Sequence, residues 1–234
     1  MSLAPGSLAG ATIAFDLDGT LVDSAPDLVG SLNTVLLEER LPTLRLEQAR
    51  LMVGRGARAL IEMGFSAAGH PVPPDRARDL TRRFIDIYRE RLAFESRPFP
   101  GLETALDTLT GAGAVLCVCT NKFTDLSVGV LEGLGLASRF AAIVGPDSAP
   151  APKPDARHLI TAVEAAGGRI DRALMIGDSA SDVGVARAAG VPSVVVTFGY
   201  TEIAAAELGG DHLIDHYSEL PALAARILAA PAAA

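Results

Sequence analysis

The sequence predicts an α/β fold in which a doubly wound, Rossmann-like parallel sheet carries an inserted α-helical domain. Short apolar runs alternate with amphipathic stretches along most of the chain, which is the pattern of repeated βαβ units. The runs are continuous, as expected of strands buried on both faces. This alternation stops between residues 24 and 94, where the patterns are helical. The predicted strands are Thr12–Phe15, Val115–Cys119, Ala141–Val144, Ala173–Ile176 and Ser193–Val196.

The first predicted strand ends in the most informative residues of the chain, Asp16 and Asp18. Strand side chains alternate between faces, so positions 16 and 18 point the same way. Two neighbouring anions repel each other unless a cation or a shared proton intervenes. Mg²⁺ is the cation we predict, because it takes oxygen ligands and keeps positions open for phosphate. The same Asp-x-Asp-Gly pattern also suits an ordinary polar turn.

Residues 24–94 form the predicted helical insertion. Ser24 is expected to cap its first helix, with Pro26 in the first turn. We therefore expect a core domain of residues 1–23 and 95–234 and a helical domain of residues 24–94. The insertion holds 11 Arg and 9 acidic residues, and this mild excess suits either attraction of an anionic substrate or an ordinary solvated surface. Two helical faces are expected, one with Leu28, Leu32, Val35 and Leu36 and one with Phe84, Ile85, Tyr88 and Leu92.

Three further polar motifs lie in loops of the predicted sheet. Thr120 and Asn121 follow the second strand, where a hydroxyl and an amide can hydrogen-bond phosphate without adding charge. Lys153 is stiffened between two prolines. Asp178 and Asp182 follow the fourth strand, one turn apart if a helix opens there. Each motif alone also suits a turn, a surface charge or a helix cap. Sites in such sheets form at the carboxyl ends of strands, so we predict that all three motifs meet the first acidic pair.

The chain uses Arg far more often than Lys as its basic residue. The chain has 18 Arg and two Lys, and both lysines, Lys122 and Lys153, fall in the candidate loops. A compact ammonium is not interchangeable with a planar guanidinium, so a Lys in a chain that otherwise uses Arg is a functional candidate. We expect Lys153 to act in the site and Lys122 to be its neighbour.

Composition argues against several kinds of partner. The net charge of −8 disfavours nucleic acid and anionic membranes, and no apolar run approaches the roughly 18 residues that span a bilayer. The N-terminus lacks the basic region of a secretory signal. Cys117 and Cys119 share one apolar strand, so we expect buried free thiols and a reducing, cytoplasmic location. Both a monomer and a homodimer are compatible with the sequence.

Taken in order, these motifs resemble those of the haloacid dehalogenase superfamily of phosphotransferases. The likeness covers essentially the whole chain, and the insertion looks like that family's small α-helical cap. Within the superfamily the chain looks most like phosphoglycolate phosphatases, on softer signals in residues 53–61, 190–192 and 198–200. The segments that carry the superfamily likeness are Phe15–Ser24, Thr120-Asn121, Lys153-Pro154 and Gly177–Asp182.

The resemblance implies roles for the acidic residues. Asp16 would be the nucleophile that becomes an aspartyl-phosphate. Asp18 would be the general acid for the leaving alcohol and then the base for the hydrolytic water. Asp16, Asp178 and the backbone carbonyl of Asp18 would bind Mg²⁺, and Asp182 would support the metal, directly or through water.

The resemblance also implies how the substrate is held. Thr120 and Asn121 would hold the phosphate, and Lys153 would balance its charge. Gly54 would let a cap loop approach the substrate closely. Arg55 would then meet a substrate carboxylate, unless it is an ordinary solvated loop residue.

The expected activity is Mg²⁺-dependent hydrolysis of a small phosphorylated metabolite, with 2-phosphoglycolate as the expected substrate. A sugar-phosphate mutase or another small-metabolite phosphatase would share the chemistry at Asp16. Haloacid dehalogenation fits less well, given Asp18 and the third acidic site, and phosphonate cleavage usually calls for a cap Lys that this chain lacks. A non-catalytic phospho-acceptor module of the receiver kind is a remote alternative, because such domains are far shorter and have no cap.

Overall fold

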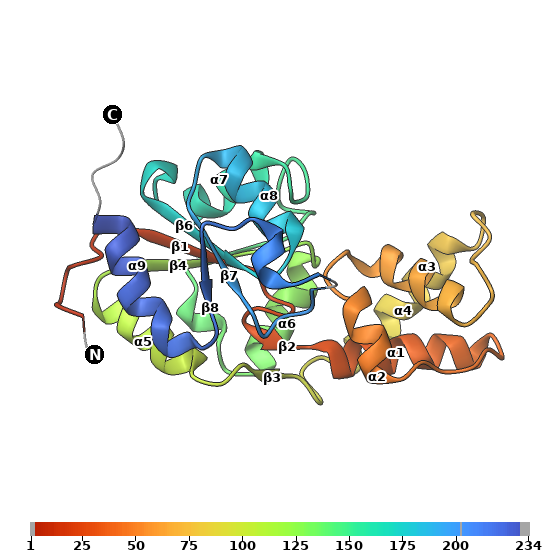
Figure 1. Ribbon diagram of the computed structural model, residues 1–234. Coiled ribbons are helices and arrows are strands. Elements are labelled where there is room, and N and C mark those ends of the chain that lie inside the picture. The colour runs from red at the N-terminus through yellow and green to blue at the C-terminus, as the bar shows by residue number, and fades with distance from the viewer. Residues whose placement is uncertain (1–2, 202, 230–234) are drawn as a thin grey trace.

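The computed structural model describes residues 3–201 and 203–229. Within these residues the main sheet has six parallel strands in the order β5-β4-β1-β6-β7-β8 (Figure 1). The predicted doubly wound α/β fold is confirmed, and so are the five predicted strands, to within one residue at each end. The strands of this sheet are β1 Thr12–Phe15, β4 Val115–Cys119, β5 Ala142–Val144, β6 Ala173–Gly177, β7 Ser193–Val196 and β8 His212–Ile214.

Helices cover both faces of the sheet, with α7 and α8 on one side and α5 and α9 on the other (Figure 1). Strand β1 is wholly buried, and its side chains alternate between the two layers. Phe15 joins the core beneath α5 and α9, whereas Ala14 joins the core beneath α7 and α8. The helices of the core are α5 Leu102–Gly111, α6 Thr124–Gly133, α7 Ala156–Ala165, α8 Ala180–Ala189 and α9 Leu220–Ala229. Short 3₁₀ turns span Arg50–Met52, Ala137–Arg139, Ile170–Arg172, Ala205–Leu208 and Tyr217–Glu219.

Strand register brings the predicted loops to one edge of the sheet. Phe15 of β1 pairs with Val118 of β4 and with Ile176 of β6. Because these three strands are parallel, the residues that follow them emerge side by side. The amide of Asp16 continues the ladder by donating to Ile176 O at 2.9 Å.

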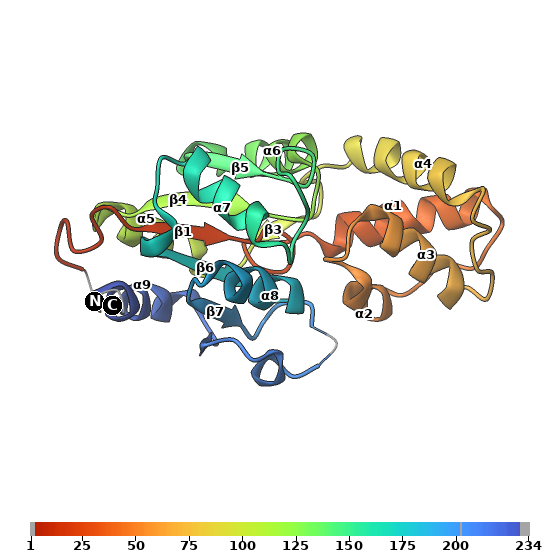
Figure 2. The same cartoon turned by 90° about the horizontal axis from the view of Figure 1, so that it is seen from above.

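The helical insertion lies beyond this carboxyl edge, at one end of the molecule (Figures 1 and 2). The predicted helical face of Leu28, Leu32, Val35 and Leu36 is confirmed, because all four residues are buried. On the second predicted face, Phe84 and Tyr88 are buried while Ile85 and Leu92 are half-buried. The predicted domain boundaries at residues 24 and 94 stay a prediction. The helices of the insertion are α1 Ala25–Glu38, α2 Leu46–Ala49, α3 Ala57–Ala67 and α4 Ala77–Arg89.

A two-stranded antiparallel ribbon connects the insertion to the core. Strand β2, Val22–Asp23, pairs with β3, Arg97–Pro98, an arrangement too short for sequence periodicity to predict. Asp27 of α1 fastens the two connections together, since its carboxylate accepts from Glu95 N at 3.0 Å and from Ser96 N at 2.8 Å. The insertion is thus joined to the core by a narrow, hydrogen-bonded neck.

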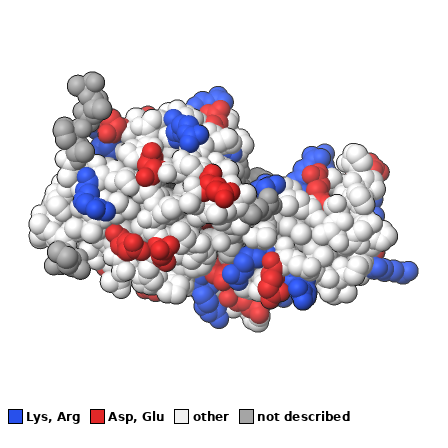
Figure 3. All heavy atoms as spheres, viewed as in Figure 1, with Lys and Arg blue, Asp and Glu red and all other residues white. Residues whose placement is uncertain are grey.

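Charged side chains of the insertion pair with one another over its surface. Arg83 of α4 forms an ion pair with Glu38 at the end of α1, at 2.6 Å. Arg76, just before α4, forms an ion pair with Glu39, just after α1, at 2.8 Å. On the face in Figure 3, blue and red side chains lie next to one another instead of forming a broad patch of one sign. Of the two interpretations of the Arg excess, this pattern favours an ordinary solvated surface over attraction of an anionic substrate. Among the described residues no helix is long and apolar enough to cross a bilayer.

Candidate active site

The polar residues predicted at strand ends gather at the carboxyl edge of the sheet. Asp16 and Asp18 follow β1, Thr120 follows β4, and Asp178 follows β6, and each of these side chains is buried. Two further buried members come from the loop after β5 and from the first turn of α8, namely Lys153 and Asp182.

Three carboxylates of this group form an acidic cluster. Asp16, Asp178 and Asp182 each offer one oxygen, and these oxygens lie within 4.8 Å of one another. Asp178 is oriented by neutral donors only, Thr20 Oγ1 at 3.1 Å and Tyr200 N at 2.6 Å. Such closely spaced buried oxygens are the donor set that a hard divalent cation takes.

Asp182 is positioned by the start of its own helix. Its Oδ2 accepts from Ser179 N at 3.0 Å and from Ser179 Oγ at 2.6 Å, and Ser179 is the N-cap of α8. Its other oxygen, Oδ1, lies 2.7 Å from Lys153 Nζ. Asp182 therefore has partners on both oxygens, whereas the hydrogen bonds described for Asp16 leave one oxygen open.

Lys153 bridges the nucleophile candidate and the cluster. Its Nζ lies 2.9 Å from Asp16 Oδ1 and 2.7 Å from Asp182 Oδ1. The amide of Leu17 also donates to Asp16 Oδ1, at 2.7 Å, so both groups hold the same oxygen and leave Oδ2 for chemistry. Asn121 fixes the backbone of Lys153, accepting from its N at 2.9 Å and donating to its O at 3.3 Å. The Asn121 amide thus contacts the loop of the lysine, a contact the sequence did not predict.

Asp18 has its own cation, which sequence reasoning treated only as a neighbour. Lys122 Nζ lies 3.0 and 3.1 Å from the two oxygens of Asp18, and Lys122 is buried. The rarity of Lys in this chain was the signal for it. Ser24 occupies the N-cap position of α1, but its hydroxyl makes no capping hydrogen bond and donates to Asp18 Oδ1 at 2.5 Å. The expected capping role of Ser24 was therefore wrong.

Burial and mutual repulsion control the ionisation of the cluster. Burial raises the pKa of Asp16 to about 6 even though Lys153 opposes the shift. Burial, followed by the charges of Asp182 and Asp16, raises the pKa of Asp178 well above its ordinary value. Burial disfavours the ammonium of Lys153, but Asp16 and Asp182 outweigh it and hold its pKa above the usual range. The carboxylates thus outnumber the cation among them, which is the condition that a metal ion relieves.

Two glycines permit this crowding. A Cβ on Gly19, which has φ of +83°, would lie 2.2 Å from Asp178 Oδ2. A Cβ on Gly199 would lie 2.2 Å from the Cβ of Asp178. Only a residue without a side chain fits at either position, so these glycines let two loops close around Asp178.

A cavity of about 60 Å³ joins the acidic residues to the helical insertion. Gly54 lines it, as predicted for a loop that approaches the site, and so does Thr120, whose Oγ1 accepts from Lys122 N at 3.2 Å and keeps its proton free to donate. Arg55 is exposed and is not part of the lining. Its predicted contact with substrate stays a prediction.

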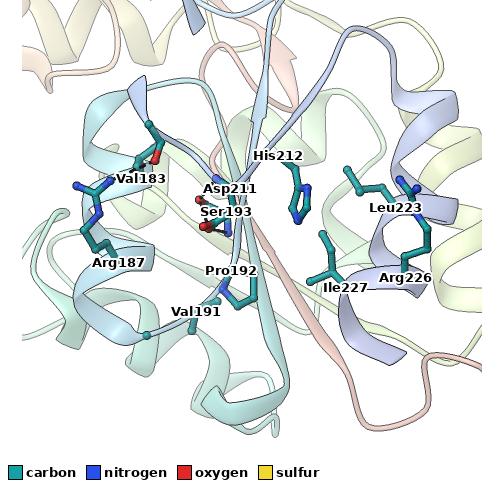
Figure 4. Close-up of a pocket in the computed structure, with 12 residues that line it drawn as sticks. Val183, Arg187, Val191, Pro192, Ser193, Asp211, His212, Leu223, Arg226 and Ile227 are labelled. Carbon is teal, nitrogen blue, oxygen red and sulfur yellow. Dashed lines mark hydrogen bonds between the residues drawn. The ribbon is translucent and has the colours of Figure 1, made fainter. Parts of the chain in front are cut away.

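A larger open depression, of about 800 Å³, lies at the opposite edge of the sheet (Figure 4). Two of its polar groups already have partners in the fold: Asp211 accepts from Ser193 N at 2.8 Å, and Arg187 donates to Gly209 O at 3.1 Å. The acidic cluster and both lysines lie elsewhere, so the smaller cavity is the candidate active site.

The parallel sheet carries, at its carboxyl edge, a buried cluster of acidic and basic groups that can hold a hard cation next to a phosphate. Residues 13–196 match the family model "Haloacid dehalogenase-like hydrolase". The chain belongs to this family, as its motifs predicted.

Relatives with established names align with nearly the whole chain. The phosphoglycolate phosphatase of Caulobacter vibrioides is 56% identical over 92% of this chain and 90% of that protein. The phosphoglycolate phosphatase of Agrobacterium fabrum is 45% identical over 94% and 95%. Among solved structures, one described as a predicted phosphoglycolate phosphatase from Haemophilus somnus superposes with a TM-score of 0.83, at 29% identity, over 92% of this chain and 98% of that chain.

Proposed function

We propose that this protein hydrolyses 2-phosphoglycolate, with Mg²⁺ and an aspartyl-phosphate on Asp16. The single observation that carries the proposal is the setting of Asp16. Its Oδ1 is held by Lys153 and Leu17, its Oδ2 is left for attack, and Asp18 lies across the same cavity. The choice of substrate rests on the relatives named phosphoglycolate phosphatase.

The reaction proceeds in two displacements. Asp16 Oδ2 attacks phosphorus, the bond from phosphorus to the ester oxygen breaks, and Asp18 gives its proton to the departing alkoxide. A water then attacks the phosphorus of the aspartyl-phosphate while Asp18 takes the proton of that water, and the bond from phosphorus to Asp16 breaks. Splitting the transfer in this way replaces one difficult step by two easier ones.

The protein's own groups supply positioning and charge balance, which phosphoryl transfer mainly requires. Lys153 orients Asp16 and offsets the negative charge that the phosphate brings. The Thr120 hydroxyl donates to a phosphate oxygen, and Asn121 keeps the Lys153 loop in place. Lys122 and Ser24 hold Asp18 toward the ester oxygen.

The acidic cluster fits Mg²⁺ by its chemistry, since its oxygens are hard donors and Asp178 has only neutral partners. Asp16, Asp178 and the backbone carbonyl of Asp18 would bind the ion, and Asp182, whose Oδ1 is engaged by the Lys153 ammonium, would support it through water. When bound, Mg²⁺ neutralises the carboxylates and the approaching phosphate.

The helical insertion is proposed to act as a cap, residues 24–94, over a core of residues 1–23 and 95–234. The partner is a small phosphorylated metabolite, with no role for nucleic acid or membrane, and the protein acts as a monomer or homodimer.

We place the protein in the cytoplasm, because Cys117 and Cys119 are free, buried thiols. Burial raises the pKa of Cys117 to about 12, which keeps this thiol unreactive.

A phosphate-release assay tests the proposal. The protein with Mg²⁺ should release phosphate from 2-phosphoglycolate catalytically, and folded Asp16→Asn should release none, because an amide is a poor nucleophile. Mass spectrometry of acid-quenched wild-type reactions should place one phosphoryl group on the peptide that contains Asp16. Normal turnover by Asp16→Asn, or a modified peptide elsewhere in the chain, would refute the assignment.

A further inference from the structure

Apart from Asp16, Asp18, Thr120 and Asn121, the lining of this cavity is mostly apolar, with two polar exceptions. Tyr88, on α4 of the insertion, and Lys122, in the loop after β4, both line it. Lys122 is the one cation among the lining residues that the structure describes. The apolar part of this lining consists of Leu28, Val53, Ala57, Leu60, Phe84, Phe123 and Leu126.

The Tyr88 hydroxyl lacks a partner. Tyr88 is 0% exposed, and its hydroxyl makes no hydrogen bond within the described part of the chain. Buried polar groups are almost always hydrogen-bonded, because leaving one unpaired costs its desolvation. Tyr88 lines the cavity next to Lys122, so a ligand that enters the cavity can supply the missing partner of the hydroxyl.

Lys122 lies between the Tyr88 ring and the reaction centre. Its Nζ lies 3.0 Å from Asp18 Oδ1 and 4.4 Å from the centre of the Tyr88 ring. The ammonium is thus placed between the carboxylate that serves the ester oxygen and the aromatic side chain of the cap. An anion bound here would meet one positive charge and one hydroxyl donor, with apolar walls around it.

We infer that Lys122 and Tyr88 bind the carboxylate of the substrate's leaving group. This inference rests on the proposed function and adds the substrate class: a short phosphorylated 2-hydroxy acid, with its carboxylate bonded directly to the carbon that bears the ester oxygen. The ester oxygen must lie beside Asp18, which exchanges a proton with it. A carboxylate two bonds from that oxygen then falls within reach of Lys122 Nζ. The residues that recognise the carboxylate are therefore Lys122 in the core loop and Tyr88 on α4, and Arg55 is not among the residues that line the cavity.

The small cavity adds a limit on length. Its volume is about 60 Å³ and most of its remaining walls are apolar. A polyol leaving group, such as that of a sugar phosphate, would leave hydroxyls unpaired against these walls. The site therefore selects for a short leaving group that carries one carboxylate close to the ester oxygen.

The test compares two substrates that differ in the carboxylate, 2-phosphoglycolate and ethyl phosphate. Tyr88→Phe removes only the hydroxyl and should raise KM for 2-phosphoglycolate about tenfold, the size of a lost hydrogen bond to a charged group, and should raise KM for ethyl phosphate far less. Lys122→Met should lower kcat for both substrates, because Asp18 loses its partner, and should lower kcat/KM further for 2-phosphoglycolate. Arg58→Met, which removes an exposed cap cation paired with Glu62, is the matched control and should change neither.

Glycolate binding provides a readout that needs no turnover. Calorimetry should show glycolate binding to the wild type in the presence of phosphate, with weaker binding to Tyr88→Phe and Lys122→Met and unchanged binding to Arg58→Met. Equal effects of Tyr88→Phe on both esters, together with unaltered glycolate affinity, would overturn the inference. A wild type that binds glycolate through these residues but does not hydrolyse 2-phosphoglycolate would instead overturn the proposed function.

Discussion

At the scale of single residues, each of the two central aspartates has a lysine of its own. Lys153 contacts Asp16 at 2.9 Å, and Lys122 contacts Asp18 at 3.0 Å. The two carboxylates have different surroundings, because Asp16 also faces the acidic cluster whereas Asp18 is held by the Ser24 hydroxyl. Different surroundings are what allow two chemically identical groups to serve as nucleophile and as acid and base.

Replacement of Asp18 tests this division of roles. Asp18→Asn keeps the shape of the side chain but cannot deliver a proton, so turnover of 2-phosphoglycolate should fall by about 10²- to 10⁴-fold. Binding of Mg²⁺ should persist, because the predicted metal contact of this residue is its backbone carbonyl. Calorimetry for the metal and steady-state kinetics for turnover check the two halves, and wild-type rates across the pH range would contradict the role.

Gly19 offers a second test at this scale. Gly19→Ala places a Cβ 2.2 Å from Asp178 Oδ2, so the variant should lose Mg²⁺ affinity and activity. Gly135→Ala is the matched control, because Gly135 also has a positive φ, of +70°, yet a Cβ there meets nothing within 4 Å. The control should lose only about 1 kcal/mol of stability, the cost of the backbone conformation. Equal losses of metal affinity in both variants would show that crowding at Asp178 is unimportant.

At the scale of elements, the neck between core and insertion depends on one buried carboxylate. Asp27 is 0% exposed and accepts hydrogen bonds from Glu95 N, Ser96 N and Ser96 Oγ. These bonds join the start of α1 to the segment that returns to β3. The neck therefore has a defined geometry although its ribbon is only two residues long on each strand.

We expect Asp27→Asn to weaken this neck. Asn offers one accepting oxygen where Asp offers two, so its NH₂ group faces at least the Glu95 N–H, and the free energy of unfolding should fall by about 1–3 kcal/mol. Asp125→Asn removes an exposed carboxylate that pairs with Arg89 and should cost less than about 1 kcal/mol. Urea unfolding monitored by circular dichroism checks both values, and an Asp27 variant as stable as the Asp125 control would contradict the expectation.

His158 of α7 should make stability depend on pH. Burial lowers the pKa of His158 below 6.5, although its contact with Val144 O, at 3.2 Å, opposes this shift. The unfolded chain therefore binds a proton more readily, so the contribution of His158 is present above about pH 6.5 and is lost as the pH falls below that value. His158→Gln should show a smaller loss of stability between pH 7 and pH 5 than the wild type.

The exposed His212 supplies the control for that measurement. His212→Gln should follow the wild-type dependence on pH, because this side chain lies at the surface. Thermal unfolding at several pH values gives all three curves. Parallel curves for wild type and His158→Gln would remove the buried histidine from the explanation.

At the scale of the whole molecule, the cavity that is the candidate substrate site is lined by both the core and the insertion. The cavity volume of about 60 Å³ is well below the roughly 300–1,000 Å³ of typical ligand pockets. We therefore expect the insertion to move about its neck when substrate enters and product leaves, and to exclude bulk water when it closes.

Metal binding should also stabilise the molecule as a whole. The cluster of Asp16, Asp178 and Asp182 places repelling carboxylates in the folded state only, so a bound cation favours that state. Mg²⁺ at about 100 times its Kd should add about 2.7 kcal/mol to the free energy of unfolding. Treatment with a chelator should abolish turnover and lower Tm, and magnesium should restore both. A chelated protein with full activity would exclude the metal from the mechanism.

Most of the core fold could be predicted from the sequence because its evidence is local. Continuous apolar runs define strands buried on both faces, and Gly190 ends α8 in the left-handed conformation that favours glycine. The ribbon of β2 and β3 could not be predicted, because two-residue strands carry no usable periodicity. The last strand, β8, was missed because it has no continuous apolar run and only Ile214 in it is buried. The side-chain partner of Ser24 was also missed, since a hydroxyl beside a helix start is equally suited to capping and to a tertiary hydrogen bond.

The sequence by itself determined the family, the parallel sheet and the acidic, amide and lysine groups at its carboxyl edge, because short motifs and apolar runs are properties of neighbouring residues. Only the tertiary structure decided which partner each group has. Lys122 contacts Asp18 across 104 positions of the chain, and Tyr88 approaches both from the insertion. Such contacts depend on how separate elements pack, and no local pattern encodes the distance between them.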